Sequence, residues 1–476
     1  MSQPPPPKNS PANNDRAAPA TLEKSLGLLD GTTLVMGSMI GSGVFIVAAD
    51  ISRQVGAPGP MLLTWVITAL LTLIAALSYG ELAAAMPHAG GQYVYLREAF
   101  GPLFGFLFGW TMFLVIQTGT IAAVAVAFAK FAGVYLPWIA AGNILLQIGS
   151  FGLQSQQLIA IAVVVLLTWV NSQGVRAGAL VQNVFTFAKT AALLGLVAAC
   201  LFAGRNDGAT ARNFSDGAFW GTGLDLNMLR LVGVAMVGAL FSSDAWNSVT
   251  FTAGEMRNPS RTVPLSLGLG VGIVSLIYLA CNYGYLLVLP LEAIQNAPAD
   301  RVGTEAARAV FGSSAVQLMA AAIMVSTFGC VNGLILAGAR VYYAMALDGL
   351  FFRQVARIHP TRHTPVTSLW VQCLWACALT LTGTYSDLLD YVIFAVLLFY
   401  ILTIAGLFVL RRNRPGMERP YRAIGYPVLP ALYILVAGLI EILLLLYKPN
   451  YTWPGLIIVM LGVPVYIYWR KREITV

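Results

Sequence analysis

Two short segments of this chain combine groups that could bind a small charged molecule with residues that interrupt a helix. The first reads Gly-Ser-Met-Ile-Gly-Ser-Gly-Val-Phe over residues 37–45, and the second reads Phe-Ser-Ser-Asp-Ala-Trp-Asn over residues 241–247. Each glycine of the first weakens a helix by roughly 1 kcal/mol relative to alanine. The second places an acid and other polar side chains inside an apolar stretch. We therefore expect a helix to break at each segment.

A break at the first segment would leave main-chain groups free to bind a ligand. A half-helix that ends near Ile40 exposes carbonyls, and one that restarts near Ser42 exposes amides at its positive end. Helix N-termini bind carboxylates, and free carbonyls accept hydrogen bonds from an ammonium. The expected groups are the amides of Ser42, Gly43 and Val44 and the carbonyls of Met39, Phe241 and Ser242. The pattern predicts a site for a zwitterion, which suits an amino acid better than a sugar or an inorganic ion.

Four polar side chains lie within apolar stretches near these segments. Inserting Lys189 at the middle of the membrane would cost at least ~2.5–3.5 kcal/mol, so we expect hydrogen-bond acceptors for it inside the helical bundle. The alternative is a lysine whose side chain extends to the membrane surface. Asp244 could contact the substrate or a proton, or cap the restarted helix, and the cap is slightly favoured. Tyr278 and Asn332 are more typical of helix–helix hydrogen bonds than of ligand contacts.

Two glutamates in apolar stretches raise the same question of partners. Glu81 lies beside a Met-Pro boundary, where we expect it to pair with a basic residue. Glu441 has no partner that the sequence identifies.

The composition indicates that these segments belong to a membrane protein. Of the 476 residues, 58% are hydrophobic and 10% are charged, against roughly 45–50% and 25% in a soluble domain. The mean hydropathy is +0.75, and the apolar blocks have the length of about 20 residues that crosses a bilayer. Twelve spans are predicted, near residues 28–51, 60–86, 102–133, 157–171, 179–203, 228–254, 264–289, 314–346, 366–384, 388–410, 428–447 and 453–469.

The two breaks lie five spans apart, in the first and sixth predicted spans. That spacing is typical of two five-helix repeats of opposite topology that meet at the bilayer midplane. For the first break alone, Gly-x-x-x-Gly helix packing is an alternative. Interrupted backbone is tolerated in a bilayer only where it is buried or lines an aqueous cavity, so the pair predicts a cavity. The expected division is a disordered cytoplasmic tail (1–26), two repeats (27–205 and 206–412) and a C-terminal region (413–476).

The net charge of +8 indicates membrane orientation rather than nucleic-acid binding. Most of the 28 Lys and Arg residues fall on one side if the N-terminus is cytoplasmic, which predicts that both termini face the cytoplasm. Residues 1–20 lack the apolar core of a signal peptide. The five cysteines lie in apolar blocks without metal-ligand spacing, so we expect packing roles, no metal and no cofactor.

Several ordered motifs resemble the amino acid-polyamine-organocation superfamily. They are the 37–45 segment, Tyr-Gly-Glu-Leu at 79–82, Pro-His-Ala-Gly-Gly-Gln-Tyr at 87–93, Gly-Glu-Met-Arg-Asn-Pro at 254–259, Val-Asn-Gly at 331–333 and Ala-Gly-Ala-Arg at 337–340. The similarity is greatest to the L-type amino acid transporters and the bacterial serine/threonine exchangers. It implies a 5+5 inverted repeat with discontinuous helices 1 and 6 and two peripheral helices, and sodium-independent transport by alternating access.

The resemblance also implies roles for individual residues. Ser42 and Gly43 would bind the carboxylate, and Phe241 would supply a carbonyl and an aromatic lid. Lys189 would replace a sodium ion of sodium-coupled relatives and brace the first break, with Tyr278 as a possible helper. Asn247 and Asn332 would lie near the pocket for the substrate side chain.

The sequence departs from this branch at Ser243 and Ala245, where an aromatic residue and a glycine are usual, and this leaves the pocket's shape open. No outer-loop cysteine matches the one that links animal transporters to an accessory glycoprotein. We therefore expect a bacterial-type cell-membrane protein that works alone and exchanges small neutral L-amino acids.

Other functions remain as alternatives. A cationic amino acid or polyamine permease would use Asp244 to bind a second ammonium, and a proton-coupled symporter would use Lys189 to carry the proton. A non-transporting sensor of this fold is also left open. An enzyme is disfavoured, because His88, His359 and His363 lie in predicted loops without a catalytic arrangement.

Overall fold

The computed structural model describes residues 21–139, 143–148, 151–221, 223, 225–382, 385–447 and 449–474, which are predominantly helical. The helices of the first half are α1 (Leu28–Met39), α2 (Gly43–Val55), α3 (Pro58–Ala85), α4 (Gln92–Phe100), α5 (Pro102–Thr111), α6 (Gln117–Ala132), α7 (Ser155–Ser172), α8 (Val175–Ala198), α9 (Asp207–Asn213) and α10 (Asp216–Phe219). Those of the second half are α11 (Leu226–Ser242), α12 (Ser248–Phe251), α13 (Pro259–Val288), α14 (Leu291–Gln295), α15 (Val302–Phe311), α16 (Ala315–Leu347), α17 (Val366–Leu381), α18 (Tyr385–Asn413), α19 (Val428–Tyr447) and α20 (Pro449–Ile474).

A small antiparallel hairpin departs from the all-α prediction. It pairs β1 (Ile144–Ile148) with β2 (Phe151–Gln154) between α6 and α7. These residues lie between two predicted spans, in a connection for which the sequence predicted no helix. Two short paired strands can therefore form there. The hairpin is peripheral and leaves the helical core unchanged.

Within the described residues, nine helical stretches are long and apolar enough to cross a membrane, and the bent pair α1–α2 makes a tenth. Two shorter apolar helices, α11 and α17, lie where the sixth and ninth spans are predicted. α11 is short because it stops at the second break. The structure therefore supports a polytopic membrane protein and does not by itself establish twelve spans.

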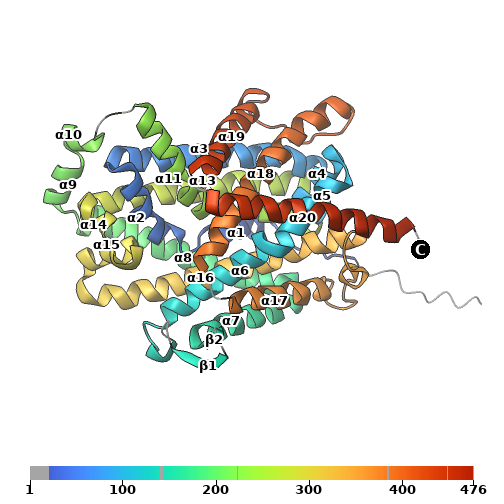
Figure 1. The fold of residues 1–476 in the computed structure, drawn as a ribbon, viewed down its shortest axis with the longest axis horizontal. Coiled ribbons are helices and arrows are strands. Elements are labelled where there is room, and N and C mark those ends of the chain that lie inside the picture. The colour runs from blue at the N-terminus through green and yellow to red at the C-terminus, as the bar shows by residue number, and fades with distance from the viewer. Residues whose placement is uncertain are drawn as a thin grey trace, which may run out of the picture.

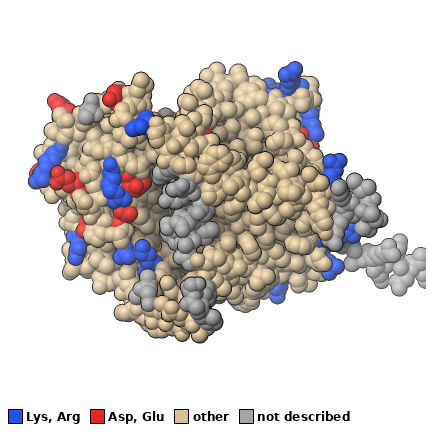
Figure 2. Space-filling view, viewed as in Figure 1, with Lys and Arg blue, Asp and Glu red and all other residues tan. Residues whose placement is uncertain are grey.

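The surface has the charge distribution expected for a protein in a bilayer. On the face shown in Figure 2, the charged side chains of the described residues gather at the two ends of the long axis, and almost none are seen between them. Leucines 435, 439 and 446 of α19 are more than half exposed, as expected for side chains that face lipid. In Figure 1, α9, α10, α14 and α15 lie at one end of the molecule, and α4 and the C-terminal end of α20 lie at the other.

The two broken helices pack against each other in the centre. α2 packs along α11, and α1 packs along α8, α13 and α16 and contacts α12. The most buried membrane stretch, Pro102–Ala132, has 78% of its apolar window inside the protein, whereas Thr452–Arg470 has 28%. α20 is therefore peripheral, and the breaks lie in the core.

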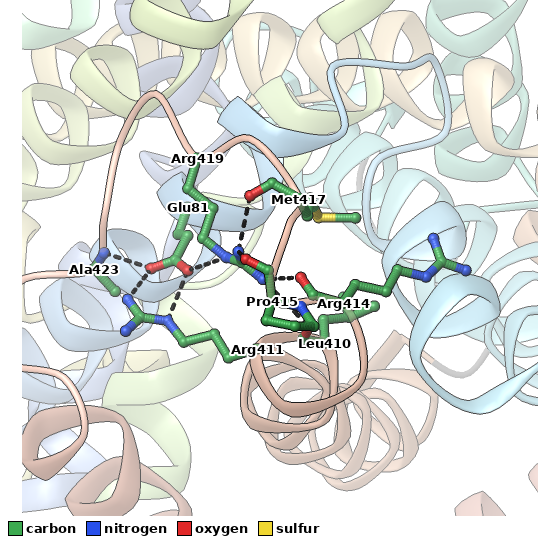
Figure 3. Close-up of polar contacts among 8 residues, drawn as sticks. All are labelled: Glu81, Leu410, Arg411, Arg414, Pro415, Met417, Arg419 and Ala423. Carbon is green, nitrogen blue, oxygen red and sulfur yellow. Dashed lines mark hydrogen bonds and ion pairs between the residues drawn. The ribbon is translucent and has the colours of Figure 1, made fainter.

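Glu81 is paired as the sequence predicts. Its carboxylate accepts hydrogen bonds from Arg411 at 2.8 and 2.6 Å and from the amide of Ala423 at 2.7 Å, and Arg419 lies 3.2 Å away (Figure 3). Glu81 is buried, so the two guanidinium groups supply the compensation that a buried carboxylate needs. The cluster joins the end of α3 to the last turn of α18 and to the segment that follows it.

A second buried ion pair lies near the chain's N-terminal segment. Glu255 and Arg340 are both fully buried and form two hydrogen bonds of 2.8 and 2.9 Å. Leu26 pairs through its backbone with Met256 beside them. The predicted disordered tail falls mostly on residues 1–20, which lie outside the described residues; Ser25 and Leu26 are buried.

Candidate substrate site

The first predicted break is present. α1 ends at Met39, Ile40 is extended (φ −76°, ψ 92°), and α2 begins at Gly43. The axes of the two helices differ by 44°. The irregular residues between them lie where the glycines made a helix least stable.

Side chains from three surrounding helices hold the carbonyls at the end of α1. Lys189 of α8 is 1% exposed, and its ammonium donates to the carbonyls of Gly37 at 2.6 Å, Ile40 at 2.7 Å and Ser326 at 3.2 Å. Lys189 therefore does not reach the surface, and its charge lies at the negative end of the α1 dipole. The hydroxyl of Ser326 in α16 donates to the carbonyls of Ile40 at 3.0 Å and Gly41 at 2.9 Å.

Tyr278 of α13 joins the first break to the second. Its hydroxyl lies 3.0 Å from the carbonyl oxygens of both Met39 and Ser242. These are two of the three carbonyls expected to accept hydrogen bonds from a substrate ammonium. A carbonyl oxygen has two lone pairs, so the Ser242 carbonyl can accept a second donor while it contacts the tyrosine. The Met39 carbonyl already accepts from the Gly41 amide at 2.9 Å as well.

The amides at the start of α2 are available to an anion. Among the described residues, the N–H groups of Ser42, Gly43 and Val44 have no backbone acceptor. The Ser42 side chain does not cap the helix. These are the first amides of a helix, where a carboxylate is stabilised by the unpaired donors and by the dipole.

Gly43 is required by the close approach of the two breaks. A Cβ atom at this position would lie 2.8 Å from the Cβ and 3.1 Å from the Cα of Ser242. By contrast, a Cβ at Gly41 would meet only the Cys330 sulfur, at 3.7 Å. The hydroxyl of Ser242 is buried without a hydrogen-bond partner among the described residues, and it faces Gly43.

The second predicted break is also present, between the end of α11 at Ser242 and the start of α12 at Ser248. Ala245 has a positive φ of 64°, which turns the chain sharply between the two helices. The amide of Asp244 donates to the Phe241 carbonyl at 3.1 Å, so this third expected carbonyl also has a protein donor.

Asp244 does not cap the restarted helix, and the preference for a cap was wrong. α12 starts four residues later, and no side chain caps it. The Asp244 carboxylate instead accepts a hydrogen bond of 2.6 Å from the hydroxyl of Tyr400. Both residues line a cavity of about 20 Å³, which is room for about one water molecule. Its other polar lining residues are Gln92, Gln117, Thr120 and Asn247, and the rest are apolar.

Asn247 lies at the same cavity and contacts the first residue of α4. Its amide donates to Gln92 at 2.7 Å. Gln92 in turn donates to the Phe399 carbonyl at 3.1 Å and to Thr403 at 3.0 Å. This chain of hydrogen bonds links α12 and α4 to α18.

Asn332 lies away from that cavity and its amide group is used by protein partners. It donates to the Gly178 carbonyl at 3.0 Å and to Gln182 at 2.9 Å, and it accepts from Asn171 at 2.8 Å. Asn332 is fully buried. Its contacts join α16 to α7 and α8, the helix–helix role that the sequence favoured for it.

Sequence reasoning gave no role to Ser326 or Tyr400. Both are hydroxyl-bearing residues inside predicted spans, so the available signal was the cost of burying an unpaired hydroxyl. Within the part of the chain that the structure describes, no group of three His, Cys, Asp or Glu side chains is arranged to hold a metal ion.

The sequence of this chain is similar to those of known transporters. A family model described as amino acid permease matches residues 26–466. The large neutral amino acids transporter small subunit 2 of Mus musculus is 30% identical over 466 residues, covering 95% of this chain and 82% of the mouse protein. The human b(0,+)-type amino acid transporter 1 is 30% identical over 447 residues, covering 92% and 86%. The serine/threonine exchanger SteT of Bacillus subtilis is 30% identical over 454 residues, covering 95% and 98%.

Proposed function

The chain belongs to the amino acid permease family, and we propose that it exchanges small neutral L-amino acids across the cell membrane without sodium. Membership of the family confirms the resemblance to the amino acid-polyamine-organocation superfamily. It also confirms a membrane transporter of amino acids rather than an enzyme. The exchange mode, the sodium independence and the substrate size are our proposal.

The observation that carries the proposal is the set of unpaired amides at the start of α2. The amides of Ser42, Gly43 and Val44 have no backbone acceptor among the described residues, and an α-carboxylate would accept hydrogen bonds from them. The α-ammonium would donate to the remaining lone pair of the Ser242 carbonyl and would replace the Tyr278 hydroxyl at the Met39 carbonyl, which also accepts from the Gly41 amide. Main-chain groups would thus recognise both charges that every amino acid carries.

Lys189 supports the absence of sodium coupling. Its ammonium already supplies a buried positive charge to the carbonyls of Gly37, Ile40 and Ser326. A sodium ion prefers the same carbonyl oxygens, and a second cation beside the ammonium would be repelled. A fixed lysine would brace the break in every step of the transport cycle.

The cavity beside Asp244, Asn247 and Tyr400 would hold the substrate side chain under a lid formed by Phe241. Its small volume and its polar groups favour a short side chain that carries a hydrogen-bond donor. Asp244 also favours a second candidate, a cationic amino acid permease or proton-coupled symporter, because a carboxylate in this cavity would pair with a second ammonium or carry a proton.

For the architecture we propose twelve spans arranged as a 5+5 inverted repeat followed by two peripheral helices. The repeats would cover residues 27–205 and 206–412, after the tail 1–26 and before the region 413–476. The breaks at α1–α2 and α11–α12 would begin the two repeats. We propose that both termini are cytoplasmic and that the chain works without an accessory glycoprotein, as its similarity to a bacterial exchanger over 98% of that protein supports.

Uptake into proteoliposomes tests the proposal. Labelled serine, alanine, leucine and arginine are supplied outside, with or without unlabelled amino acid inside, while sodium and pH gradients are varied separately. We expect uptake of small neutral substrates that requires internal substrate and ignores both gradients. Uptake into empty vesicles driven by a proton gradient, or uptake of arginine alone, would establish the second candidate instead.

A further inference from the structure

A second cavity lies at the edge of the helical bundle, away from the substrate site. It has a volume of about 410 Å³ and is lined by Arg97, Pro102, Asp348, Leu350, Tyr466 and Arg470. These residues come from the end of α4, the start of α5, the end of α16 and the last turns of α20. The charged side chains of the cavity therefore come from three separate parts of the chain.

The position of the cavity corresponds to the boundary of the membrane. Pro102 begins one membrane-spanning stretch, Arg470 ends another, and Leu350 follows the end of a third at Leu347. Aromatic side chains lie beside it: Phe352 is 53% exposed and packs against Trp469 with ring centroids 5.4 Å apart. Exposed aromatic residues at the ends of spans are typical of the depth at which lipid headgroups lie.

Most charges at the cavity neutralise one another. Arg97 contacts Asp348 and lies 2.9 Å from Glu98, and Arg414 lies 2.8 Å from the same glutamate. Burial opposes ionisation of Glu98, but Arg414 and Arg97 hold its pKa below the ordinary value. The two guanidinium groups and two carboxylates therefore sum to no net charge.

Arg470 adds a positive charge that this network does not balance. It is exposed, lines the cavity, and forms no ion pair with any side chain that the structure describes. Lys471 and Arg472 follow it in the sequence. A basic cavity between membrane helices at headgroup depth is the arrangement that binds anionic lipid headgroups.

We propose that this cavity binds the phosphate group of an anionic lipid headgroup and that Arg470 is the cation that recognises it. The guanidinium group forms paired hydrogen bonds with phosphate oxygens. The lipid's acyl chains would lie along the exposed apolar face of α20, where Ile467 and Leu461 are about half exposed. A bound headgroup would connect α20 to the ends of α5 and α16. The site is independent of the proposed transport function.

Thermal unfolding of the purified full chain in detergent tests the proposal, with dioctanoyl phosphatidylglycerol, dioctanoyl phosphatidylcholine and inorganic phosphate as separate probes. We expect phosphatidylglycerol to stabilise the protein saturably and the other two to do so weakly. Arg470→Glu changes the charge by two, so it should weaken the apparent affinity for phosphatidylglycerol roughly thirtyfold. Arg470→Gln changes the charge by one and should weaken this affinity about fivefold. Arg357→Glu, an exposed arginine in the loop after α16 that does not line the cavity, is the matched control and should change nothing.

The possible outcomes separate the sources of the phosphate. Equal affinities in wild type, Arg470→Gln and Arg470→Glu would overturn the site. Stabilisation by inorganic phosphate as strong as that by the lipid, and lost in Arg470→Glu, would overturn the lipid assignment and identify a soluble phosphate compound. Equal stabilisation by phosphatidylcholine would show that acyl chains rather than charge drive binding, which would also refute the proposal.

Discussion

Replacing Lys189 with methionine tests whether a fixed ammonium maintains the geometry of the first break. Methionine keeps an unbranched apolar chain of similar length and removes the charge, so a large empty cavity is avoided. The variant removes the ammonium as a hydrogen-bond donor from three carbonyls, those of Gly37, Ile40 and Ser326.

The structure indicates how much this costs. Ile40 keeps the Ser326 hydroxyl at 3.0 Å. Gly37 loses its donor, because the amide of Gly41, four residues on, bonds to Met39 instead. An orphaned buried carbonyl costs about 1–3 kcal/mol, and losing a cation at a helix C-terminus adds up to about 2 kcal/mol. Relief of the desolvated ammonium offsets part of this. A net loss of about 2 kcal/mol predicts a roughly thirtyfold fall in exchange.

Exchange of labelled serine for internal serine in proteoliposomes measures the effect, with thermal unfolding of the same preparations to separate misfolding from lost transport. Lys130→Met, at an exposed lysine near the end of α6, is the matched control and should exchange at the wild-type rate. If Lys189→Met folds and exchanges like the wild type, the ammonium does not hold the break and the reasoning is refuted.

Three further substitutions test other contacts. Gly43→Ala should abolish exchange, whereas Gly41→Ala should retain it, because only a Cβ atom at residue 43 would lie less than 3.2 Å from the main chain of α11. Equal activity of the two variants would contradict the close contact between α2 and α11. Tyr278→Phe should lower the exchange rate by about tenfold, which corresponds to the free energy of about one buried hydrogen bond. An unchanged rate would show that the Tyr278 hydroxyl does not connect the two breaks. Glu255→Gln should destabilise the protein by about 3–5 kcal/mol by leaving Arg340 without its buried partner, and Glu255→Gln with Arg340→Met should recover much of the melting temperature; no recovery would count against the pair.

The sequence was a good guide where the backbone's own chemistry is decisive. Glycines at 37, 41 and 43 and the polar run 241–247 predicted both breaks, because they make a helix unstable whatever surrounds it. The burial of Lys189 followed from the cost of a charge in a bilayer. Glu81 found basic partners for the same reason, although which arginines they are depends on how the end of α18 folds back.

Features that depend on packing could not be predicted in this way. Whether Asp244 caps α12 depends on where the helix restarts, and the turn at Ala245 moves that point to Ser248. The different roles of Gly41 and Gly43 follow from the distance to α11, which no local pattern encodes. The contacts of Asn332 likewise arise only when α7 and α8 pack against α16.

Tyr278 provides a physical link between substrate binding and the position of the two broken helices. Its hydroxyl has one proton and lies 3.0 Å from two carbonyls, those of Met39 and Ser242, so it can donate fully to only one at a time. The Gly41 amide also donates to the Met39 carbonyl at 2.9 Å, so the Ser242 carbonyl is the one left without a full donor when the hydroxyl turns to Met39. Under the proposed function, a substrate ammonium brings three donors to this point, and it can satisfy both carbonyls only while α1 and α11 stay close. Substrate binding would then favour the conformation in which the breaks are joined, and release would allow them to separate, because a ligand shifts an equilibrium by its difference in affinity for the two states.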